Sequence, residues 1–101
     1  MESVLAPISK SISSIDSTSL RSLIESLANV LDMLRADGTI TNDAYLDAGA
    51  IQGGMMMIAN LIDAGIDRNE LAEHMSALVS RSKRVEQSHP GISSSIESAL
   101  S

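Results

Sequence analysis

The sequence contains no cysteine, no phenylalanine and no tryptophan, and its only aromatic residue is Tyr45. Without cysteine the chain can form no disulfide, no thiolate metal site and no catalytic thiol. Without large aromatic side chains a core must be built from Leu, Ile, Val, Met and Ala, which suits helix-on-helix packing better than a sheet sandwich. The composition therefore predicts an all-α fold.

Long apolar runs are also absent. The longest uncharged run, residues 48–62, is shorter than the roughly 20 residues that a membrane span needs. Residue 2 is a glutamate and no basic segment precedes a sustained apolar one, so we expect no secretory signal and a cytoplasmic location. The net charge of −6 is spread along the chain, which disfavours nucleic acid as a partner.

Apolar residues recur at spacings of three and four, the period of an amphipathic helix. This pattern predicts long helices over residues 17–36, 42–64 and 68–88, and short helices over about 4–14 and 93–100. The length of 101 residues, 44% of them hydrophobic, predicts a single domain. Because the connections are short, consecutive helices should be antiparallel. The expected architecture is an up-down-up three-helix bundle with short additional helices at the N- and C-termini.

A shared local pattern marks the start of each long helix. A capping residue, Asp16, Thr41 or Asp67, follows an isoleucine that can contact an apolar side chain one turn into the helix. The glycines at 38 and 65 stand before the second and third starts, where a chain reversal needs a residue free to adopt positive φ. Pro7 is expected in the first turn of the short N-terminal helix, where its missing N–H is tolerated.

The central helix, residues 42–64, is apolar on two sides. One stripe consists of Ala44, Ala48, Ile51, Met55, Ile58 and Ile62, and the other of Leu46, Ala50, Met57 and Leu61. The same segment carries Gly49, Gly53 and Gly54, each of which costs about 0.8–1.0 kcal/mol relative to Ala inside a helix. We expect either a second backbone packed closely against these glycines or a bend in the helix.

Each neighbouring helix has one apolar stripe and leaves part of the central helix uncovered. We therefore predict an interaction surface formed by Tyr45, Gly49, Gln52, Gly53, Met56, Met57 and Asn60. Glycines one turn apart permit close approach of another helix, and unbranched methionines adapt to irregular surfaces. The alternative reading is that small and flexible residues are needed only for packing inside the bundle.

The sequence has no residue pattern typical of a catalytic or metal-binding site. The stretch DGTITND resembles the second half of an EF-hand calcium loop, but that register places Met33, Arg35 and Ala44 at ligand positions. His74 and His89 lie four turns apart, and no G-x-S-x-G motif is present. We predict no catalytic residue, no metal site and no cofactor.

The sequence thus predicts a non-enzymatic protein–protein interaction module, an adaptor, inhibitor or accessory regulator. Its expected partners are itself, as a homodimer or larger assembly, and a further protein that the sequence does not identify. An alternative is a small-ligand or nucleotide-binding module with a polar pocket near Tyr45, Gln52 and Asn60 at an oligomer interface.

Overall fold

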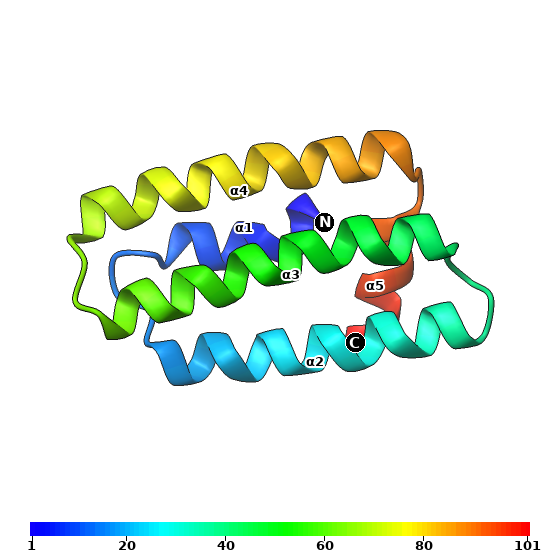
Figure 1. The fold of residues 1–101 in the computed structure, drawn as a ribbon, viewed down its shortest axis with the longest axis horizontal. Coiled ribbons are helices and arrows are strands. Elements are labelled where there is room, and N and C mark those ends of the chain that lie inside the picture. Colours follow the sequence, from blue (N-terminus) through cyan, green and yellow to red (C-terminus); the bar gives the residue numbers. More distant parts are fainter.

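The computed structural model describes residues 1–101, which form five α-helices and no strand. The helices are α1 (Glu2–Lys10), α2 (Ser17–Ala36), α3 (Asn42–Asp63), α4 (Arg68–Ser88) and α5 (Ile92–Leu100). The prediction of an all-α protein is confirmed, and the helices pack against one another as a bundle (Figure 1). None of them is both long and apolar enough to cross a membrane.

The three expected caps are present at the starts of the long helices. The side chain of Asp16 accepts the backbone N–H of Ser19 at 2.7 Å, and that of Thr41 accepts the N–H of Ala44 at 3.0 Å. The carboxylate of Asp67 accepts the N–H groups of Asn69 and Glu70. These bonds satisfy backbone donors that a helix leaves without partners in its first turn.

Helix α1 differs from its predicted span of about 4–14. It begins at Glu2 and ends at Lys10, so Pro7 lies inside the helix and not in its first turn. The hydroxyl of Ser11 donates to the carbonyl of Pro7 at 2.9 Å. Such local side-chain bonds to the backbone compete with continuation of a helix, which explains why the serine-rich residues after Lys10 form turns.

Side chains from both short helices contribute to the core. Helix α3 contacts both α2 and α4, whereas α1 packs against α4 and α5, and α5 also packs against α2. Figure 1 shows α2, α3 and α4 side by side along the long axis, with α1 and α5 following one another on the side of the bundle away from α3. Leu5 of α1 and Ile96 of α5 are fully buried. Both short helices therefore enclose the core.

Helix α5 receives its cap from another helix. Gly91, with φ of 92°, precedes it and carries no side chain that could cap it. Instead the carboxylate of Glu86 in α4 accepts the backbone N–H groups of Gly91 and Ser93, each at 3.0 Å. These two bonds hold the pKa of Glu86 below its ordinary value, the bond from Gly91 contributing most.

The two apolar stripes of α3 have different environments. Most of the first stripe faces the core: Ala44, Ala48, Ile51, Met55 and Ile58 are buried. In the second stripe, Leu46 and Met57 are 65% and 47% exposed, Ala50 is exposed, and Leu61 is half-buried. The bundle thus covers one side of α3 and leaves the other open to solvent.

Candidate interaction surface on helix α3

One strip of the solvent-exposed side of α3 is uncharged over four turns, and the exposed Asp47 lies beside it. We define this outer face as Leu46, Gly49, Ala50, Gly53, Met56, Met57 and Asn60, which recur at helical spacing. The exposed sides of the neighbouring helices are different: Glu25 and Asp32 of α2 and Glu73 and Arg84 of α4 are all exposed. An exposed apolar side on one helix, between helices with charged surfaces, is typical of an interaction site.

Contacts with α2 fix one edge of the outer face. The guanidinium of Arg21 donates to the side-chain oxygen of Asn60 at 2.7 Å and lies 3.1 Å from the sulfur of Met56. It also forms an ion pair with Asp63 at 2.8 Å, and the hydroxyl of Ser17 donates to the same carboxylate at 2.5 Å. The bond from Ser17, followed by that from Arg21, lowers the pKa of Asp63.

Tyr45 lies at the same edge and is half-buried between α2 and α3. Its hydroxyl donates to the carboxylate of Asp32 at 2.6 Å, and the guanidinium carbon of Arg35 lies 4.3 Å from the ring centroid. The hydrogen bond to Asp32 raises the pKa of the Tyr45 phenol. This predicted interaction residue is therefore already engaged within the chain. Gln52, another predicted residue, is half-buried.

The three glycines of α3 have different surroundings. A Cβ atom on Gly54 would overlap the Cδ1 atom of Leu78 in α4. A Cβ atom on Gly49 or Gly53 would meet nothing within 4 Å. Packing inside the bundle accounts for glycine at residue 54 alone, because no neighbouring atom within the chain requires glycine at the other two positions.

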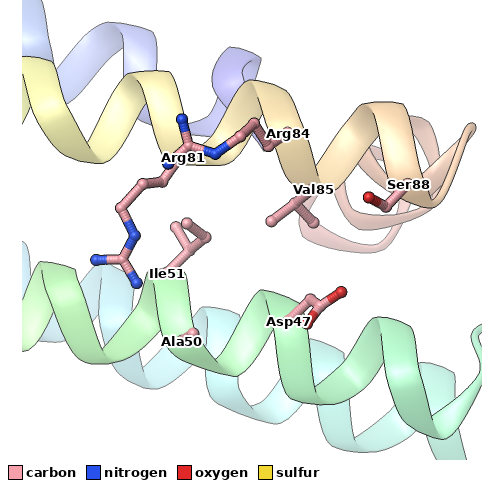
Figure 2. Close-up of a pocket in the computed structure, with 7 residues that line it drawn as sticks. All are labelled: Asp47, Ala50, Ile51, Arg81, Arg84, Val85 and Ser88. Carbon is pink, nitrogen blue, oxygen red and sulfur yellow. The ribbon is translucent and has the colours of Figure 1, made fainter.

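Basic side chains border the other edge of the outer face. A cleft of about 230 Å³ between α3 and α4 is lined by Asp47, Ala50, Ile51, Arg81, Arg84, Val85 and Ser88 (Figure 2). The Arg81 side chain extends from α4 toward α3. Asp47 is 2.7 Å from His89, which follows α4. Neither Arg81 nor Arg84 belongs to an ion pair within the chain.

No group of three or more His, Cys, Asp or Glu side chains is arranged to hold a metal ion. The single chain has four cavities, and Tyr45, Gln52 and Asn60 line none of them. A ligand pocket that forms only at an oligomer interface stays a prediction. Sequence reasoning missed the contacts of Arg21 with α3 and the pair formed by Asp47 and His89, because both join residues more than 30 positions apart.

Comparison with protein-family models, with curated proteins and with solved structures finds no match for this chain.

Proposed function

We propose that this protein is a non-enzymatic protein–protein interaction module that self-associates through the outer face of α3. One observation carries the proposal: Leu46, Met56 and Met57 are 65%, 39% and 47% exposed on a strip of α3 that has no charged residue. Transfer of such side chains from water into an interface is favourable by roughly 25 cal/mol per Å² of apolar surface.

The glycines add to this argument. Gly49 and Gly53 weaken the helix, and no atom of the same chain makes them necessary. A helix from a second copy could approach closely at these positions, because they present backbone and no side chain to the interface. A homodimer is the simplest assembly that would cover the face, and closed two-fold symmetry is the commonest arrangement of soluble oligomers.

The proposal includes an up-down-up course of the three long helices, which puts α3 between two antiparallel neighbours and leaves one side of it free. It also includes a role as an adaptor, inhibitor or accessory regulator in the cytoplasm, acting on a further protein. The short connections between the long helices support the up-down-up course.

Light scattering behind a sizing column tests the self-association. At tens of micromolar we expect the wild type to have the mass of a dimer or larger assembly, and the Gly53→Leu variant to have a smaller mass with equal or greater helicity by circular dichroism. The matched control is Ser26→Leu, which places the same side chain on an exposed position of α2 and should keep the wild-type mass. A monomeric wild type would refute the proposal.

A further inference from the structure

We propose that two copies of the chain pack their α3 helices antiparallel, around a two-fold axis that passes beside Gly53. This inference rests on the proposed self-association and adds its direction and register. Two independent observations carry it: the order of large and small side chains on the outer face, and the order of unpaired charges along α4.

Large and small side chains are placed symmetrically about Gly53. Met56 touches Arg21 and thus lies toward α2, and Gly49, seven residues before it, lies on the same side of the helix. Ala50 lines the cleft beside Arg81 and thus lies toward α4, and Met57, seven residues after it, shares that side. Each side of the outer face therefore has a small residue before Gly53 and a methionine after it.

An antiparallel two-fold pairing matches large residues with small ones. In that arrangement the α4 side of one copy meets the α4 side of the other with its direction reversed, so Met57 is opposite Ala50 of the second copy. On the α2 side, Met56 is opposite Gly49 of the second copy. Gly53 meets its own symmetry mate, where the absence of side chains lets the two backbones approach.

A parallel two-fold pairing places large side chains opposite large ones and small side chains opposite small ones. The α4 side of one copy would then meet the α2 side of the other at the same level, so Met57 would face Met56 and Ala50 would face Gly49. Methionines would hold the helices apart at one end, and small residues would leave voids at the other. Interfaces pack as densely as protein interiors at their centres, so the antiparallel arrangement is favoured.

The charges of α4 also favour an antiparallel pairing of the two copies. Glu70 and Glu73 lie in its first turns and Arg81 and Arg84 in its second half, and none of the four belongs to an ion pair within the chain. Leu78, beside Gly54, marks the level of the proposed axis. When the second copy runs antiparallel about that level, the acidic end of its α4 meets the basic end of the first α4. Arg84 then lies opposite Glu73 of the second copy.

The parallel pairing would instead place α4 against α2 of the second copy. On the side of α2 that carries Arg21, two charged residues already have partners, because Arg21 is paired with Asp63 and Asp32 accepts the Tyr45 hydroxyl, and Glu25 between them has no ion pair. Arg21 and Asp32 gain little from a second partner, and Glu25 offers only one charge to the acidic and basic residues of α4. The unpaired charges of α4 are therefore better satisfied when α4 of one copy meets α4 of the other.

Cysteine cross-linking tests the direction without interference from native thiols, since the chain has none. Leu46 and Asn60 are each seven residues from Gly53, so the antiparallel register places Leu46 opposite Asn60 of the second copy. The two copies of Leu46 would then be about 21 Å apart along the helix, too far for a disulfide. The variants Leu46→Cys and Asn60→Cys are mixed, one of them labelled with ¹⁵N, and oxidised mildly.

Mass spectrometry then separates the mixed disulfide from the two homogeneous ones. We expect the mixed Leu46→Cys and Asn60→Cys product to dominate over both homogeneous products. Dominance of the homogeneous products would indicate a parallel pairing and overturn this inference, while self-association through α3 would stand. If the mixed protein is dimeric by light scattering but forms no disulfide, contact lies elsewhere, and both proposals fail.

A charge exchange tests the second observation. Arg84→Glu should weaken dimerisation about tenfold, because it places like charges opposite each other at two symmetric positions. Adding Glu73→Arg to the same chain should restore the wild-type dissociation constant by re-forming both pairs with exchanged signs. Failure of the second substitution to restore affinity would contradict the proposed register.

Discussion

The Cδ1 atom of Leu78 in α4 occupies the space that a side chain on Gly54 of α3 would need. This contact explains one glycine of the central helix through packing inside the chain. It also separates Gly54 from Gly49 and Gly53, which have open space above them. Stability measurements can make the same distinction.

Gly49→Ala should stabilise the folded chain by about 1 kcal/mol, because alanine restores helix propensity and its Cβ meets no neighbour. Gly54→Ala should be less stable than Gly49→Ala by about 1–3 kcal/mol, because its Cβ forces Leu78 to move in the core. Urea denaturation at concentrations where the chain is monomeric measures both. Equal stabilisation by the two substitutions would mean that Leu78 yields freely.

Asp67→Ala should lower the free energy of unfolding by on the order of 1 kcal/mol, because its carboxylate caps two N–H groups of α4. Ile66→Ser should have a comparable effect through loss of a half-buried apolar contact at the same helix start. Asn69→Ala is the control, since Asn69 is exposed. An unchanged denaturation midpoint for Asp67→Ala would show that the cap contributes nothing.

Glu86→Gln should destabilise the protein at neutral pH, because it removes the charge that accepts the N–H groups of Gly91 and Ser93. The pKa of Glu86 is lowered in the folded chain from its ordinary value of 4.5. The unfolded chain therefore binds the proton more readily. The stabilising contribution of the Glu86 carboxylate is complete above pH 4.5, and it is lost as the pH falls through the lower pKa that Glu86 has in the folded chain.

The difference in stability between wild type and Glu86→Gln should consequently shrink as the pH is lowered below 4.5. Urea titrations over a series of pH values measure this difference. Glu25→Gln serves as the control, because Glu25 is exposed and forms no ion pair within the chain. A constant difference at all pH values would indicate that the charge of Glu86 does not matter.

Calcium or zinc at stoichiometric concentration should leave the circular dichroism and the melting temperature unchanged. A metal that binds the folded chain would raise the melting temperature, and the chain offers no group of three or more suitable side chains. A rise of several degrees with either metal would reveal a site assembled from two copies. Addition of a chelator should then reverse it.

The long helices could be predicted from sequence because their signals are local. The caps at Asp16, Thr41 and Asp67 act within three residues, and the apolar spacing repeats over several turns of each helix. The bounds of α1 were predicted less accurately from the sequence. Its register depends on burial of Val4, Leu5 and Ile8 against helices distant in sequence, and this burial outweighs the cost of Pro7 in its interior.

The candidate site was predictable only in part. The two apolar sides of α3 can be read from helical period, but which side faces the core depends on tertiary packing. Period alone could not separate Gly54, which packs on Leu78, from Gly53, which is exposed. It also gave no indication that Tyr45 and Asn60 are already bonded to α2, since those partners lie 13 and 39 residues away.

The shared side of the bundle formed by α1 and α5 has a consequence for folding. The pairs α2–α3 and α3–α4 join neighbours in sequence, whereas α1 packs against α4 and α5, and the Met1 amino group donates to the Ser93 hydroxyl. Closing a long loop costs more entropy than closing a short one, and distant contacts slow folding. We infer that the helical hairpins α2–α3 and α3–α4 form early in folding. Packing of α1 against α5 then completes the core last.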